Sequence, residues 1–503
     1  MTAPTRSDSC GEIDCRPLAR DGRLRPVKAI RHPIPASVLV LVVALLTGCA
    51  RFHDRPLTAE KTSADFHTRT LSDPGLRAFL ETNQPGHVLT WPLTSWNFNS
   101  LALAAFYFHP DLDVARAKWG VTRSGQVTAG ERPNPTVSFA PGYNSTVGPP
   151  WILGLSFDLP IETAGKRGHR IAHAGHLSAA ARLNIATVAW QVRSRVRRSL
   201  LELEAAREME SLLTRQQEAQ AAIVKLLEGQ LAAGAVSPFE VTQARVAQDT
   251  TRLALHDAER QAAEARAQLA DALGVPSAAL DGVSLSFDRA PLPPLPTPDV
   301  RRQALLNRAD LRGALAEYAA AQAALQLEVS KQYPDLHLGP GYQLDQTANK
   351  WTLGLSVTLP IFNQNQGAIA DAEARRTESA AHFTALQAHV LGELDRATAG
   401  YRALLAKSAT ADALLARLQK QEQSTQEMVA AGGLPRLALL TAQLELNTGR
   451  LAQLDTQLKT RQALAALEDI VQLPLPPAGG DAASIPLSAP LVEPSPRTAK
   501  EQP

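Results

Sequence analysis

Two segments of this chain, about two hundred residues apart, have nearly the same sequence. Residues 151–161 read WILGLSFDLPI, and residues 351–361 read WTLGLSVTLPI. Shorter matches recur at almost the same offset: Asp111-Leu112 and Asp310-Leu311, Pro141-Gly142-Tyr143 and Pro340-Gly341-Tyr342, Ala232-Ala233-Gly234 and Ala430-Ala431-Gly432. A constant offset over so much of the chain indicates one structural unit duplicated in register. We therefore expect the function to require both copies.

The repeated segments alternate between apolar and small or polar residues. Odd positions from 351 to 359 are apolar, while even positions from 352 to 358 are Thr, Gly, Ser and Thr. Positions 151–159 alternate likewise, with Ile152 as the exception. This period of two predicts strands. It suits a membrane barrel wall with lipid outside and water inside, and it equally suits a soluble sandwich. The Trp that opens each segment favours an interfacial aromatic girdle.

Two long proline-free stretches follow the strands, from Ala164 to Ala233 and from Gln366 to Ala431. A helix of about 70 residues measures roughly 100 Å, at about 1.5 Å per residue. Shorter helices are expected at about 238–273 and 300–332. Apolar residues in the first stretch recur with the spacing of a coiled-coil seam: Ile185, Val188, Val192, Val196, Leu200, Leu203, Ala206, Met209 and Leu213.

These patterns predict the organisation of the chain. Residues 49–100 are expected to be an extended lead-in, and the proline-rich residues 291–299 a linker. The first repeat is predicted at 101–290, with strands at about 135–160 and a hairpin tip at about 234–237. The second is predicted at 300–475, with strands at about 334–361 and a tip at about 432–435. Residues 476–503 are expected to be a disordered tail.

The N-terminal region predicts a cleaved signal peptide over residues 1–48. A basic stretch precedes the short apolar run Val38–Leu46, which is too short to cross a bilayer. The following Leu46-Thr47-Gly48-Cys49 resembles the lipobox of bacterial lipoproteins, which implies lipidation of Cys49; the alternative is an ordinary secretory signal. Besides Cys49 the chain has only Cys10 and Cys15, so no disulfide framework is expected downstream.

Charge and motifs exclude several classes of function. The net charge is +2 with mixed signs, so no nucleic-acid footprint is present. The sequence contains no nucleophile elbow, P-loop or dinucleotide fingerprint. We therefore predict a protein that is not an enzyme and that needs no cofactor.

The duplicated unit of helix, two strands and helical hairpin resembles the TolC-type outer-membrane efflux proteins over residues of about 100 to 475. Motifs that carry the resemblance are Pro110-Asp111-Leu112, Ala309-Asp310-Leu311, the two Leu-Pro-Ile sequences and Gly234-Ala235-Val236-Ser237. Residues 359–367, LPIFNQNQG, look most like the CzcC-like heavy-metal subgroup.

The resemblance implies a mainly α fold with a small membrane β-barrel. Three chains would supply four strands each to a trimeric 12-stranded β-barrel, continued by a periplasmic α-helical barrel. About eight strands are the fewest that close a lipid-facing barrel. A single chain has too few, so the interpretation requires a homotrimer.

The two hairpin tips are the candidate docking ends for a periplasmic adaptor, as the resemblance implies. Their residues are Gly234, Val236 and Ser237 at the first tip, and Gly432, Leu434 and Pro435 at the second. Gly permits a tight reversal, and the residues after it leave room for a partner hairpin. The alternative is that both tips are only turns.

Two further candidates have weaker support. Glu240 is a possible gate residue in an acidic ring. The second tip has no carboxylate before Glu445, however, and this favours interpreting Glu240 as a solvated charge on its helix. The trio His169, His173 and His176 shares one helix face and is a weak metal candidate. Neighbouring cationic residues would repel a metal ion, so no metal site is predicted.

The sequence thus predicts an outer-membrane exit duct of a tripartite efflux pump, lipid-anchored and with a large periplasmic extension. The expected partners are an adaptor (membrane fusion protein), an inner-membrane transporter and outer-membrane lipid, without nucleic acid. One alternative is the duct of a type I protein secretion system. Another is a non-channel periplasmic coiled-coil adaptor or scaffold lipoprotein. The sequence does not identify the exported substrate; heavy-metal cations are one candidate.

Overall fold

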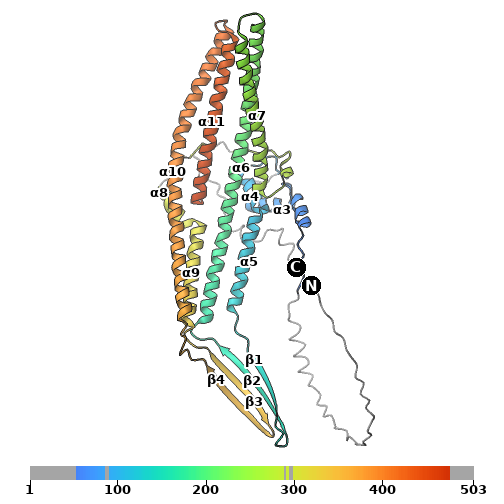
Figure 1. Cartoon of the computed structure of the whole chain (residues 1–503), viewed down its shortest axis with the longest axis vertical. Coiled ribbons are helices and arrows are strands. Elements are labelled where there is room, and N and C mark those ends of the chain that lie inside the picture. Colours follow the sequence, from blue (N-terminus) through green and yellow to red (C-terminus); the bar gives the residue numbers. More distant parts are fainter. Residues whose placement is uncertain (1–51, 85–89, 288–290, 294–297, 476–503) are drawn as a thin grey trace, which may run out of the picture. The chain divides into compact units, whose positions relative to one another are not determined.

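The computed structural model describes residues 52–84, 90–287, 291–293 and 298–475 (Figure 1). Of these, residues 52–61 belong to one unit and the residues from Thr62 onward to a second, which contains all the elements below apart from the start of the helix that begins at Ala59. The predicted signal peptide, the three cysteines and the predicted tail lie outside the described residues.

The elements of the second unit follow one order twice, as Figure 1 shows. The first copy contains α5 (Pro110–Gly130), β1 (Thr136–Tyr143), β2 (Trp151–Ile161), α6 (Lys166–Ala232) and α7 (Pro238–Leu273). The second contains α9 (Ala309–Ser330), β3 (Leu336–Asp345), β4 (Ala348–Val357), α10 (Gln366–Ala430) and α11 (Arg436–Val471). The duplicated, mainly helical architecture predicted from the repeat is confirmed. The shorter elements are α2 (Ala59–His67), α3 (Pro74–Asn83), α4 (Phe98–Phe108), the 3-10 helix η1 (Ser277–Leu280) and α8 (Pro298–Asn307).

The strands of both copies form one antiparallel sheet in the order β1-β2-β3-β4. The central pair, β2 and β3, joins the first copy to the second. The 174 residues between Ile161 and Leu336 contain the helices α6 to α9. The two copies are therefore held together through backbone hydrogen bonds as well as through helix packing.

The long helices α6 and α10 have 67 and 65 residues. Each begins after a residue in the left-handed backbone region, Gly165 with φ 71° and Asn365 with φ 65°. Gly adopts this region without steric cost and Asn does so more readily than most residues, so both positions allow the chain to turn from strand into helix. In the described part of the chain, no helix has the length and apolar composition needed to cross a membrane.

Helix α6 is the central element of the helical part, because it packs against α4, α5, α7, α9 and α11 (Figure 1). Helix α10 packs against α8, α9 and α11. The largest apolar core lies around α6 near the middle of its length and includes Leu76, Phe106, Ile185 and Leu269, each at most 1% exposed. Burial of such side chains is the main stabilising term of the fold.

The expected extended lead-in at 49–100 differs from the structure, which places α2, α3 and the start of α4 within it. Asp73 caps α3 by accepting hydrogen bonds from the backbone N–H groups of Gly75 and Leu76, at 2.7 and 3.1 Å. Helix α4 is almost uniformly apolar, and its residues 100–108 are all buried. A helix surrounded on every side has no polar face, so its sequence lacks the periodicity that identifies most helices. The predicted linker 291–299 also overlaps the start of α8.

Candidate functional site

One face of the four-stranded sheet is apolar from edge to edge. The register places Phe139 opposite Leu155, and Leu155 opposite Tyr342. Nothing in the described chain covers this face, because Trp351 is 80% exposed and Leu353 73%. A continuous exposed apolar surface of this kind marks contact with a membrane or with another protein.

The opposite face of the sheet carries small and polar residues. A side chain at Gly341 would place its Cβ 2.6 Å from the Thr352 hydroxyl oxygen, so this face is also closely packed. The register on this face pairs Ser138 with Ser156, Gly154 with Gln343, His337 with Ser356, Gly339 with Gly354, and Gly341 with Thr352. The sheet thus has one face suited to lipid and one suited to water.

An aromatic pair lies at the far end of each strand hairpin. The rings of Tyr143 and Trp151 are 5.2 Å apart between centroids, and those of Tyr342 and Trp351 are 4.8 Å apart. Both pairs are on the apolar face, at equivalent positions of the two copies. Tyr and Trp rings are amphipathic and favour the boundary between membrane and water.

The outer strands β1 and β4 each have only one neighbour in the described sheet. Their outer edges therefore leave backbone N–H and C=O groups without strand partners. Within a membrane such groups must be paired, since lipid offers no hydrogen bonds. The sheet of one chain is accordingly an incomplete wall.

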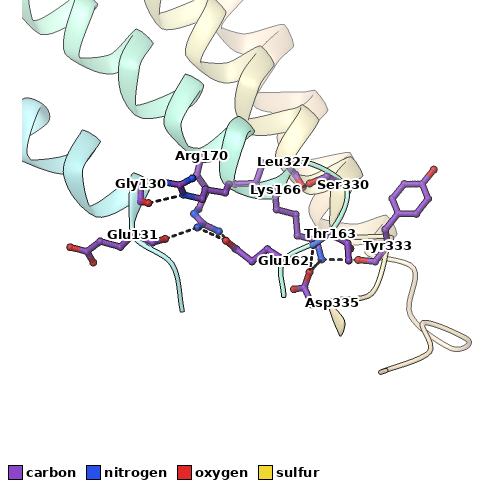
Figure 2. A network of polar contacts seen from close by, with 11 residues as sticks. Gly130, Glu131, Glu162, Thr163, Lys166, Arg170, Leu327, Ser330, Tyr333 and Asp335 are labelled. Atoms are coloured by element: carbon purple, nitrogen blue, oxygen red, sulfur yellow. Dashed lines mark hydrogen bonds and ion pairs between the residues drawn. The ribbon is translucent and has the colours of Figure 1, made fainter. Parts of the chain in front are cut away.

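An ion pair with a buried lysine joins the start of α6 in the first copy to the chain just before β3 of the second copy (Figure 2). The Lys166 ammonium, 7% exposed, donates to the Asp335 carboxylate and to the Tyr333 carbonyl, both at 2.7 Å. The Thr163 backbone N–H donates to the same carboxylate at 2.9 Å. Burial by itself would raise the pKa of Asp335, but the hydrogen bonds from Lys166 and Thr163 outweigh it and lower that pKa.

A second set of contacts ties the start of α6 to the end of α5. Arg170 pairs with Glu162 and also donates to the Glu131 carbonyl at 3.2 Å (Figure 2). The Arg167 side chain donates to the Gly130 carbonyl at 2.7 Å. We call these contacts and the Lys166–Asp335 pair the first junction.

The equivalent place in the second copy, the second junction, is built differently. The Asn365 side-chain amide donates to the Glu328 carbonyl at 2.8 Å and to the Glu328 carboxylate at 2.9 Å. The carboxylate also pairs with Lys331, which is 46% exposed, at 2.7 Å. Burial would raise the pKa of Glu328, and the bonds from Lys331 and Asn365 lower it. The second junction thus uses an amide where the first uses a buried cation.

The predicted docking residues lie at the two turns that connect the long and short helices. Gly234 and Gly432 have φ values of 73° and 78°, which only Gly adopts without strain. Val236 and Leu434 are partly buried at equivalent positions, while Ser237 and Pro435 are exposed. The two turns share one backbone design, and nothing in the described chain covers them.

The two tips differ in how the following helix begins. Ser237 caps α7 in a capping box, in which the Glu240 carboxylate accepts from the Ser237 N–H at 3.2 Å and from its hydroxyl at 3.0 Å. Helix α11 starts after Pro435 without a side-chain cap. Glu240 therefore has a local structural role in the single chain, and whether it also gates the pore stays a prediction.

One member of the histidine trio of α6 contacts a neighbouring helix. His173 has its Nδ1 atom 2.9 Å from the Ala320 carbonyl of α9, so this ring takes part in helix packing. Among the residues that the structure describes, no three His, Cys, Asp or Glu side chains are grouped so that they could hold a metal ion.

Sequence reasoning missed two pairs that the fold brings together, Lys166 with Asp335 and Asp158 with His337. Their members are more than 160 residues apart, and no local pattern links them. The strand alternation does place Asp158 and His337 on the polar face, so it could have identified that pair once the strand order was known.

A sheet with one lipid-suited face and long paired helical hairpins defines the class of outer-membrane channel proteins. The model of the outer membrane efflux protein family matches residues 107–275 and 300–471. These ranges cover more than half of the chain, and the chain belongs to this family. The predicted family is confirmed, and it is a family of channels rather than enzymes.

Named relatives and a solved structure agree with the family. The cobalt-zinc-cadmium resistance protein CzcC of Cupriavidus metallidurans is 29% identical over 306 residues, which are 60% of this chain and 72% of that protein. The pyoverdine export outer membrane protein OpmQ of Pseudomonas aeruginosa is 29% identical over 222 residues, 42% of this chain and 46% of that protein. The outer membrane protein VceC of Vibrio cholerae has a similar structure, with a TM-score of 0.62 at 20% identity, over 74% of this chain and 95% of that chain.

Proposed function

We propose that three copies of the chain close their sheets into one twelve-stranded β-barrel in the outer membrane. Strand β4 of one copy would pair with β1 of the next, which satisfies both open edges at once. The apolar face would meet lipid and the polar face would line a water-filled lumen. Exposed apolar residues on the helices, such as Val121 of α5 and Leu253 of α7, supply further surface for neighbouring copies.

We further propose that the helices continue this pore into the periplasm as the exit duct of a tripartite efflux pump. The tips around Gly234 and Gly432 would dock a periplasmic adaptor, which joins the duct to an inner-membrane transporter. Cys49 would carry the lipid that anchors each chain. The duct itself conducts passively, because the chain has no motif for coupling energy to transport.

For the substrate we propose divalent cations of the cobalt, zinc and cadmium class. The support is the named relative CzcC, a cobalt-zinc-cadmium resistance protein, which matches the chain over 306 residues. The similarity to a pyoverdine export protein covers a shorter range of 222 residues. Deletion of the chain from its host should therefore sensitise the cells to these cations. Unchanged metal tolerance with loss of a secreted protein would instead favour a type I secretion duct.

The observation that carries the proposal is the apolar face that runs unbroken across all four strands while both sheet edges stay open. A periplasmic adaptor or scaffold has no use for such a surface. The test is single-channel recording of the purified full-length protein in planar bilayers. We expect discrete conductance steps, with larger steps when the tips are loosened by substitution. A complete lack of conductance in every variant would overturn the proposal.

A further inference from the structure

The polar face of the sheet holds a histidine–carboxylate pair that none of the roles above uses. The Nδ1 atom of His337 on β3 lies 3.1 Å from both carboxylate oxygens of Asp158 on β2. The register places His337 opposite Pro160, so Asp158 is its diagonal neighbour on the same face. Both side chains are accessible, at 38% and 49% exposure.

The geometry sets the direction of the imidazole ring. An ionised carboxylate can only accept hydrogen bonds, so Nδ1 of His337 must carry the proton that is shared with Asp158. In the neutral ring the second nitrogen, Nε2, then has a free lone pair. A carboxylate that holds one ring nitrogen while the other faces a ligand is the usual arrangement of metal-binding histidines.

We propose that His337, oriented by Asp158, is a transient contact site for divalent cations of the zinc and cobalt class in the lumen. This inference rests on the proposed trimeric pore, in which the polar face lines the lumen and each copy contributes one pair. One imidazole per copy binds such an ion weakly, with water as the remaining ligands. Weak binding suits a duct, because an ion that passes through must be released again.

The charged surroundings are compatible with cation binding. Other charged groups close to this end of the sheet are Asp335, just before β3, Lys166 of α6, and Glu162 after β2 with its partner Arg170. The Lys166 charge is neutralised by its ion pair with Asp335. On the other side of His337, β4 contributes the uncharged Ser356. The charged group in direct contact with the ring is the Asp158 carboxylate, which attracts cations.

The experiment adds ZnCl2 to full-length protein during single-channel recording in KCl, with MgCl2 as the reference salt. Zn²⁺ prefers imidazole ligands whereas Mg²⁺ prefers oxygen. We expect brief current blocks with Zn²⁺ but not with Mg²⁺ in the unmodified protein. His337→Gln should abolish the blocks, and Asp158→Asn should raise the Zn²⁺ concentration needed by about 10- to 100-fold.

Two controls make the result specific. His256→Gln alters another histidine–carboxylate pair, which lies on α7 with His256 2.9 Å from Glu259, and should leave the blocks unchanged. The triple variant H169Q/H173Q/H176Q tests the trio on α6 and should also leave them unchanged. Blocks that persist in H337Q, or that vanish in either control, would overturn the inference.

A measurement on the unmodified protein covers the case in which H337Q does not assemble. Imidazole suits Ni²⁺ as well as Zn²⁺, whereas Ca²⁺ prefers oxygen ligands, so NiCl2 should also block the current and CaCl2 should not. Equal blocks by Ca²⁺ and Zn²⁺ would point to carboxylates alone and contradict the inference. A protein that conducts without any response to Zn²⁺ overturns only this inference, whereas a protein that never conducts overturns the proposed pore.

Discussion

The two copies of the repeat have nearly equal lengths but very different surroundings. Helix α6 buries eighteen of its 67 residues, whereas α10 buries six of its 65. The strands differ in the same direction, because Leu155 of β2 is 36% exposed and the equivalent Leu355 of β4 is 70% exposed. Both differences have one cause: β2 and α6 lie inside the chain, while β4 and α10 lie at its boundary. The comparison supports the proposal that the next copy of the chain binds at the boundary of the second copy.

The largest expected effect comes from a charge on the apolar face. Leu155→Arg and Leu355→Arg should each abolish insertion, at a cost of about 2 to 4 kcal/mol per chain near the bilayer centre. The free-energy costs of the two substitutions should be similar, because in the assembled barrel β4 has a neighbouring strand on each side, as β2 does. The measurement is the amount of trimer in the outer-membrane fraction.

The matched control for these variants is Thr352→Arg, which places the same charge on the polar face of β4 and should still insert. If Leu355→Arg inserted as well as the unmodified protein, β4 would not face lipid. The comparison of inner and boundary strands would then be wrong.

The next largest effect concerns the two junctions. Lys166→Met removes a buried cation and leaves Asp335 with only the Thr163 N–H as a partner, and should lower the free energy of unfolding by about 2 kcal/mol. Asn365→Gly removes the amide hydrogen bonds without straining the left-handed backbone, and should cost about 1 kcal/mol. Denaturant unfolding in detergent measures both. Equal losses would show that the two junctions are energetically equivalent despite their different chemistry.

Acid should weaken both junctions. The pKa values of Asp335 and Glu328 are lowered in the fold, because the hydrogen bonds and charges of their partners outweigh burial. Their contribution to stability is present above the pKa of the unfolded chain, about 4, and is lost as the pH falls through the folded value. Unfolding measured between pH 7 and pH 3 should show this loss, and Lys166→Met should reduce it. An identical acid response in Lys166→Met would contradict the assignment to Asp335.

The smallest effect separates the two tips. Ser237→Ala removes the cap of α7 and should cost that helix end about 1 kcal/mol, whereas α11 has no side-chain cap to lose. In hydrogen exchange, the first turn of α7 should exchange about fivefold faster in Ser237→Ala. The first turn of α11 should exchange faster than that of α7 in the unmodified protein. The reverse order would show that the caps do not set the stability of the tips.

The sequence predicted those parts of the fold that depend on local periodicity. Strict alternation identified the strands, and the absence of proline between Ala164 and Ala233 identified the first long helix. Helices α2 and α3 were missed because the lead-in that contains them is polar and shows no helical period. The Lys166–Asp335 pair could not be predicted, since it depends on β2 and β3 becoming neighbours. The sequence correctly placed His173 on a long helix together with His169 and His176. What the His173 ring contacts, however, is determined by the neighbouring helix α9.

The most direct test of the account is a cryo-electron microscopy structure of the full-length protein in lipid nanodiscs. The account predicts three chains around one closed barrel, with β4 of each copy hydrogen-bonded to β1 of the next and with α10 covered by a neighbouring copy. A single chain with an open four-stranded sheet, or copies that meet through other surfaces, would contradict it.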